Sequence, residues 1–134
     1  MNDIRGFYRL YESEGITAKP TVRLEIDAVA TNGDISAKLG PLIIVGQHPP
    51  IRKLYGQYNE PVIVFTQDAP SPRAFLFPID YYEGTVMFDY SDPENIKPVT
   101  MLGSHYTVYH DPSLDRVFRG RVNPWAAVFE ITPF

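Results

Sequence analysis

Apolar and polar side chains alternate one by one along much of this chain. The longest stretch free of proline and glycine covers residues 21–32. Within it, apolar side chains recur at every second position: Val22, Leu24, Ile26 and Ala28. Charged side chains stand between them: Arg23, Glu25 and Asp27. In a strand this spacing puts each group on its own face, whereas in a helix the same residues would scatter around the axis. The pattern predicts a strand with one apolar face.

Other short apolar or alternating segments also read as strands. They cover residues 4–11, 42–45, 62–65, 74–79, 85–90, 105–109, 116–122 and 126–132. Turn-forming residues separate many of them, at 32–34, 68–72, 91–95 and 111–113. Many short strands at such spacing predict one all-β domain over residues 1–134, either an antiparallel β-sandwich or a closed β-barrel of about eight strands. At most one short helical turn is expected, near residues 113–117, with Ser113 or Asp111 as its cap.

Composition supports this fold class and excludes some chemistry. The 134 residues include 13 prolines, which are excluded from helix interiors, and no cysteine, so disulfides, thiolate metal sites and cysteine nucleophiles are ruled out. A net charge of −4 makes nucleic-acid binding unlikely on average. The first residues show no signal-peptide pattern, and no apolar stretch is long enough to span a membrane. We therefore expect a cytoplasmic or virion-associated protein.

Candidate catalytic and metal-binding residues do not form a recognisable pattern. His105 and His110 are five positions apart, so within one strand they would point to opposite faces, and His48 precedes two prolines. Ser104 beside His105 lacks the surroundings of a nucleophile elbow. Asp80 and Glu83 flank two tyrosines, which is suggestive of a sugar-binding or aromatic-binding surface. We predict no metal, no cofactor and no catalytic residue, and we favour a protein that is not an enzyme.

Two short pieces carry a resemblance to a known motif. Arg5 and Arg9 form an R-x-x-x-R, and Asp34-Ile35-Ser36 is a D-x-S followed by Gly40. Together they resemble the motif of PilZ domains, small β-barrels that bind cyclic di-GMP. The resemblance implies that the two arginines would clamp phosphates and stack on guanine. Gly40 comes one residue later than in the PilZ pattern, and about a dozen residues are covered, so the resemblance does not assign the chain to that family.

Tyrosine and arginine are enriched in binding surfaces, and this chain is rich in tyrosine. Tyrosine concentrates where one end of its ring meets water, and Tyr, Trp and Arg dominate interface hot spots. The candidate partner-binding or ligand-binding residues are Tyr81, Tyr82, Arg116, Arg119, Arg121 and Trp125. For Arg119 and Trp125 we expect alanine substitution to weaken partner binding more than folding.

Three functions fit these features. We favour a non-enzymatic protein–protein interaction module, such as a structural or accessory subunit of a virion or another assembly, with a protein partner or a second copy as its ligand. The first alternative is a small β-barrel that binds an apolar small molecule or acts as a cyclase or isomerase. The second alternative is an inhibitor or immunity-type protein that blocks a partner. An enclosed cavity of ligand size, about 300 Å³ or more, with two or more inward polar side chains would favour the ligand-binding barrel. A filled core with a flat exposed aromatic patch would favour the interaction module.

Overall fold

A computed structural model describes residues 1–12, 22–41, 52–67, 79–111 and 113–130 of the chain. Nine strands make up these regions: β1 (Gly6–Glu12), β2 (Val22–Val29), β3 (Asp34–Pro41), β4 (Arg52–Asn59), β5 (Val62–Gln67), β6 (Ile79–Asp89), β7 (Lys97–Asp111), β8 (Arg116–Arg119) and β9 (Asn123–Phe129). The strands predicted at 42–45 and over most of 74–79 lie outside the described residues, as does His48. The described residues contain no helix with the length and apolarity needed to cross a membrane.

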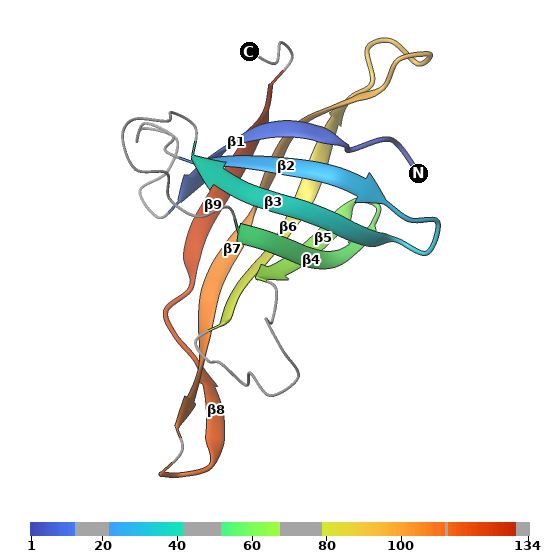
Figure 1. The fold of residues 1–134 in the computed structure, drawn as a ribbon. Coiled ribbons are helices and arrows are strands. Elements are labelled where there is room, and N and C mark those ends of the chain that lie inside the picture. The colour runs from blue at the N-terminus through green and yellow to red at the C-terminus, as the bar shows by residue number, and fades with distance from the viewer. Residues whose placement is uncertain (13–21, 42–51, 68–78, 112, 131–134) are drawn as a thin grey trace.

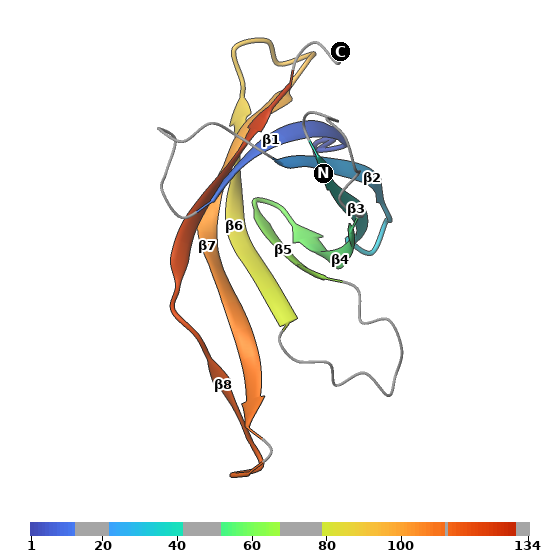
Figure 2. The ribbon, with the colours of Figure 1, turned by 60° about the vertical axis from the view of Figure 1, so that its left-hand side comes forward.

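The strands form one closed antiparallel barrel, so of the two predicted architectures the barrel is confirmed. Strands β1 to β7 pair in sequence order, β9 pairs with β7, and β1 pairs with β9 to close the ring. Strand β8 pairs only with the far end of β7 and extends it as a hairpin outside the ring. The ring therefore has eight strands, and Figures 1 and 2 show the β7–β8 hairpin projecting beyond it.

The predicted alternation places Leu24 and Ile26 inside the barrel, but it is wrong for Ala28, because a register shift between Ile26 and Ala28 leaves Ala28 exposed and packs Val29 against the core instead. Leu24 and Ile26 are buried, while Arg23 and Glu25 on the same strand lie on the outer face. The core draws on every strand of the ring, with Tyr8, Ile35, Leu54, Phe65, Tyr82, Met101 and Trp125 among its members. Burial of these side chains at about 25 cal/mol per Å² of apolar surface is the main source of stability.

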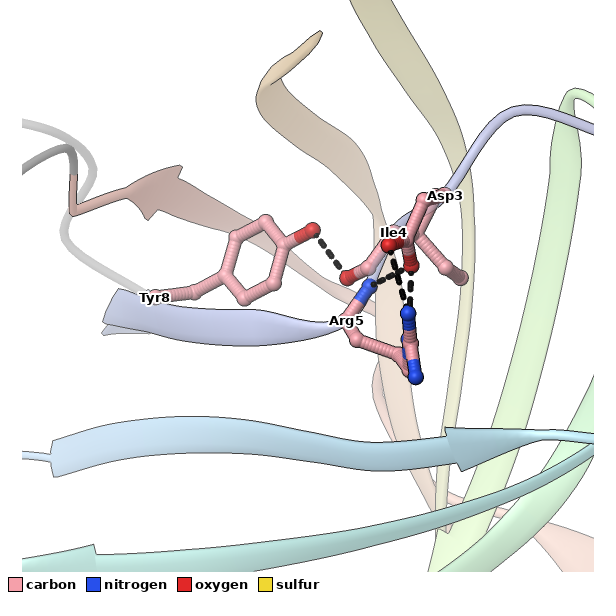
Figure 3. Close-up of polar contacts among 4 residues, drawn as sticks. All are labelled: Asp3, Ile4, Arg5 and Tyr8. Atoms are coloured by element: carbon pink, nitrogen blue, oxygen red, sulfur yellow. Dashed lines mark hydrogen bonds and ion pairs between the residues drawn. The ribbon is translucent and has the colours of Figure 1, made fainter.

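The N-terminal segment covers one end of the barrel. Ile4 is fully buried, and its carbonyl oxygen accepts a hydrogen bond of 2.6 Å from the hydroxyl of Tyr8 (Figure 3). The backbone N–H of Asn2 donates to Glu60 Oε1 at 3.0 Å, beside the β4–β5 turn. The β2–β3 turn lies at the same end, and Gly33 allows it with a φ of 92°. We call the opposite end, where β6 begins and the β7–β8 hairpin projects, the mouth.

Two strands and one turn differ from the sequence-based expectation. Strands β3 and β4 were not predicted, although Ile35, Ala37 and Leu39 alternate with polar residues. The expected helical turn at 113–117 is wrong: residues 113–115 form a tight turn, and β8 starts at Arg116. Asp111 does cap that turn, because its Oδ1 accepts a hydrogen bond of 2.9 Å from the N–H of Ser113.

Candidate functional site

Polar side chains face inward on the β6–β7–β9 side of the mouth. Asp80 stands opposite Thr107, and Tyr82 stands opposite His105, so all four share the inward face of the sheet. Asp80 Oδ1 accepts a hydrogen bond of 2.7 Å from the Thr107 hydroxyl and lies 3.4 Å from His105 Nε2. Asn123 on β9 is paired with His105 and has the same inward parity as Trp125. A convergent polar group therefore lines this wall.

Aromatic rings lie directly beneath that polar group. The Tyr82 ring stacks on Phe65 at 4.9 Å on one side and on His105 at 4.5 Å on the other. The Trp125 ring meets both Phe65 and Tyr82 edge-on, at 5.6 and 5.8 Å. Offset and edge-on contacts of this kind add about 0.5–1.5 kcal/mol per pair beyond area burial. The stack holds the His105 ring in place under the mouth.

A pair of glycines makes room for Trp125. Gly84 on β6 stands opposite Gly103 on β7, and a Cβ at Gly84 would lie 2.8 Å from the Trp125 ring. The indole N–H donates to two backbone oxygens, those of Glu83 and Ser104, each at 3.1 Å. The glycines let the indole approach the backbone closely, so that its polar edge is satisfied inside the barrel.

The polar wall is partly open to water and carries a carboxylate. The side chain of His105 is 18% exposed and that of Asp80 is 28% exposed, in contrast to the buried rings below them. An ionised carboxylate only accepts hydrogen bonds, so Asp80 selects for a group that donates them. Across the barrel, Leu10, Leu39 and Leu54 on β1, β3 and β4 point inward and are buried. The β6–β7–β9 wall of the mouth is therefore polar and lies above an apolar core.

The six residues proposed from sequence occupy three different places. Tyr82 and Trp125 are 4% and 3% exposed and belong to the aromatic stack inside the barrel. Tyr81 and Arg119 lie on the outer face, one on each side of Tyr106: Tyr81 stacks on its ring at 5.6 Å, and the Arg119 guanidinium lies 5.3 Å from it. The third place is the β7–β8 hairpin and the segment after it, where both Arg116 and Arg121 are exposed. The six do not form one surface, and their role in binding remains a prediction.

The sequence pattern places Asp80 and His105 in other combinations and does not single out Thr107. Asp80 was paired with Glu83, but Glu83 lies on the outer face, where it accepts a hydrogen bond of 2.7 Å from the Tyr106 hydroxyl. This hydrogen bond raises the pKa of Tyr106. The signal that could have found the site is the even offset from Asp80 to Tyr82, which places both on one face. Thr107 could be added only with knowledge of the β6–β7 register.

The two arginines of the PilZ-like motif do not converge on a common site. Arg5 forms a bidentate pair with Asp3 near the N-terminus, with both contacts at 2.9 Å (Figure 3). Arg9 instead lies on the outer face of β1, where its Nε is 3.2 Å from Glu130. Glu130 is also 3.0 Å from Arg23, and its side chain is only 4% exposed. Each arginine of the motif therefore already has a carboxylate partner.

Two further features were tested as sites. Open concavities of about 470 and 320 Å³ flank the N-terminal segment, but they border exposed backbone and turn residues at the covered end of the barrel. Within the described ranges, no three His, Asp or Glu side chains are grouped in a way that could hold a metal ion. The mouth is thus the best-developed candidate site.

Comparisons with known proteins agree with this geometry at the level of fold. No protein-family model matches the chain, and no curated protein sequence matches it. Among solved structures, the rhizavidin–biotin complex is similar over 98% of this chain and 96% of its own, with a TM-score of 0.57 and 13% identity. Apo shwanavidin is similar over 97% of both chains, with a TM-score of 0.56 and 10% identity. A short afifavidin–biotin complex is similar over 94% of this chain and 90% of its own, with a TM-score of 0.52 and 13% identity. The chain therefore has the eight-stranded barrel fold of avidin-like proteins.

Proposed function

We propose that this protein binds a small molecule at the mouth of its barrel. The main observation behind this proposal is the group of inward side chains of Asp80, His105 and Thr107. This group lies above the aromatic rings of Tyr82 and Trp125. A pocket with few convergent polar groups and aromatic walls is the usual form of a small-molecule site. The similar barrels solved as biotin complexes support this ligand-binding alternative over the assembly-subunit hypothesis. The cyclase or isomerase variant of that alternative stays a prediction.

The polar wall and the rings beneath it define the chemistry of the ligand. Asp80 accepts hydrogen bonds, so the polar end of the ligand should carry N–H donors, either neutral or cationic. The rings of Tyr82 and Trp125 should contact an apolar body. Biotin, which combines N–H donors with an aliphatic chain, is therefore the first probe, followed by simple amines, amides and ureas on chains of similar length.

The test compares Asp80→Asn with Glu83→Gln. Both changes neutralise a carboxylate on β6, but Asp80 faces the mouth and Glu83 faces outward. A hydrogen bond to a charged group is worth about 1.5–3 kcal/mol, so Asp80→Asn should weaken binding about 10- to 100-fold in calorimetry. Glu83→Gln should change it less than about twofold. A ligand that binds Asp80→Asn as tightly as the parent protein would contradict the proposal, as would a panel of which no member binds.

A second candidate function, self-association, has one specific observation behind it. The outer face of β5, β6, β7 and β9 presents mainly aliphatic and small side chains: Val62, Val64, Glu83, Thr85, Met87, Thr100, Leu102, Ser104 and Val128. Of these, Val62, Met87 and Leu102 are 49%, 46% and 39% exposed. In contrast, the outer face of β2–β4 carries Arg23, Glu25, Lys38 and Lys53.

A second copy is the occupant that suits this face. Each copy carries a net charge of −4, so two copies approach most easily through a face with few charges. Leu102→Glu would place two like charges in such an interface. We expect it to shift a dimer to a monomer in light scattering at unchanged thermal stability. A parent protein that is monomeric at high concentration would contradict self-association without affecting the ligand proposal.

A further inference from the structure

The β7–β8 hairpin leaves one strand edge open in an otherwise closed sheet. Strand β8 lies at the end of the strand order and pairs along one edge with Val108–Asp111 of β7. All four residues of β8 are exposed, and no other described strand pairs with its second edge. Both ribbon views show this hairpin extending away from the barrel (Figures 1 and 2). An open edge is a template for pairing with another strand.

The register shows which backbone groups are available on that edge. The N–H of Gly120 donates to the carbonyl of Thr107 at 2.8 Å, so this pair is a hydrogen-bonded one. Hydrogen-bonded and non-bonded pairs alternate in an antiparallel ladder, and therefore Phe118 and Arg116 also direct their N–H and C=O groups toward β7. Val117 and Arg119 direct theirs toward the open edge. An added strand would find two donors and two acceptors there.

Apolar side chains beside the edge are also left uncovered. Phe118 is 45% exposed and stacks on Tyr109, itself 41% exposed, at 5.5 Å on one face of the hairpin. Val117 is 56% exposed on the other face. Leu114 at the turn and Val122 after β8 are 61% and 42% exposed. These side chains give an added strand apolar contacts on both faces of the hairpin.

Charge decides which strand the edge can accept. Residues 108–122, which are the hairpin and the segment after it, hold three arginines and two aspartates, a net charge of +1, whereas the rest of the chain carries −5. Because Val117 and Arg119 face the open edge, pairing β8 antiparallel with β8 of a second copy would set Val117 of each copy opposite Arg119 of the other and would bring two hairpins of the same positive net charge together. Like charges directly opposite each other destabilise a strand pair, and opposite charges stabilise it. The edge thus disfavours its own copy and favours an acidic strand.

We propose that the open edge of β8 binds an extended acidic segment of another protein by strand addition. In the antiparallel register, the segment places acidic residues opposite Arg119 and Arg116, with two apolar residues between them, opposite Phe118 and Val117. Main-chain hydrogen bonds provide affinity in this mode, and the alternating side chains provide specificity. The surface lies on the hairpin beyond the mouth, and the proposal does not depend on a ligand in the barrel.

The experiment uses the full chain and a fluorescein-labelled octapeptide in which two glutamates flank a valine and a tyrosine. Anisotropy should show saturable binding that weakens with salt, and a scrambled peptide of the same composition should bind about tenfold less tightly. Reversing both charges with Arg116→Glu and Arg119→Glu should abolish binding of this peptide. The same double variant should acquire binding of the matching lysine-flanked peptide.

Two single variants separate strand addition from simple charge attraction. Val117→Pro removes an outward N–H that the hairpin itself does not use, so it should weaken peptide binding about tenfold while the thermal transition is retained. Arg121→Glu makes the same charge change as a reversal on β8, but it lies outside the strand and should change binding less than about twofold. Equal binding of the scrambled peptide, or full binding by Val117→Pro, would overturn the proposal, as would preferential binding of a single-stranded oligonucleotide.

Discussion

Trp125 allows the sharpest test of how the barrel is stabilised. Its indole N–H donates to the backbone oxygens of Glu83 and Ser104, and the side chain is 3% exposed. In Trp125→Phe the donor is lost, and two buried carbonyl groups lose a partner at a cost of about 1–3 kcal/mol. The smaller ring leaves part of the space empty, and since Trp→Ala in a core costs about 3–5 kcal/mol, the partial truncation should cost about 1–2 kcal/mol. We expect a total loss of about 2–5 kcal/mol.

This loss converts to a measurable shift in melting temperature. Unfolding entropies near 2.1 cal/mol/K per residue imply, for 134 residues, a shift of about 3.5 °C per kcal/mol. Trp125→Phe should therefore lower Tm by about 7–18 °C. Circular dichroism during urea and thermal unfolding is the appropriate measurement, because the substitution removes the single tryptophan and with it the fluorescence signal.

Tyr90→Phe serves as the control, because Tyr90 is 62% exposed near the β6–β7 turn. Surface changes of this kind usually stay within about 0.5 kcal/mol. If Trp125→Phe is as mild as the control, the two backbone acceptors do not contribute as described. This geometry also opposes the expectation from sequence that alanine at Trp125 weakens partner binding more than folding. The structure predicts that folding suffers first.

Two other substitutions test the packing inside the barrel. Gly103→Ala should destabilise the fold severely or prevent folding, because the new Cβ would overlap the Glu83 carbonyl oxygen. Soluble expression and circular dichroism measure this effect, and Ser91→Ala at an exposed position is the control. Tyr8→Phe should cost about 1 kcal/mol through loss of the hydrogen bond to Ile4, measured by urea unfolding. Burial first, and then the charge of Asp3, raises the pKa of Tyr8, so the folded state keeps this phenol neutral at a pH at which the unfolded chain ionises it. The parent protein should therefore lose stability as pH rises above about 10. Tyr8→Phe should lose less stability over the same pH range. If both proteins show the same pH dependence, the Tyr8 hydroxyl has the same pKa in the folded and unfolded states.

The period-two pattern predicted the all-β fold well, because a strand with one buried face has apolar side chains at every second position. Leu24 and Ile26 were placed correctly for that reason. Strand β7 was predicted only in part, since Pro98 and Gly103 read as strand breakers. Both residues are nevertheless accommodated: Pro98 pairs beside a register shift at Met87/Phe88, and Gly103 faces Gly84 under the Trp125 ring.

The candidate site was harder to predict because it depends on strand register. Asp80, Thr107 and Asn123 come from three strands, and their proximity follows from pairings that no local pattern contains. The location of Trp125 also depends on its neighbours across the sheet. Tryptophan as a residue type favours interfaces, but the glycines on β6 and β7 leave room for the indole ring inside the barrel, and Trp125 is buried there.

Closure of the ring has a consequence for the chain while it is being synthesised. Strand β1 emerges early, but its second neighbour is β9, and the pairing of Tyr8 with Phe129 joins the two extremes of the described sequence. Until β9 appears, β1 exposes a full row of backbone donors and acceptors to other nascent chains. A product that stops after β8 would not be a smaller barrel but an unsealed sheet with two open margins. A chain cut between β8 and β9 should therefore aggregate rather than give a soluble fragment.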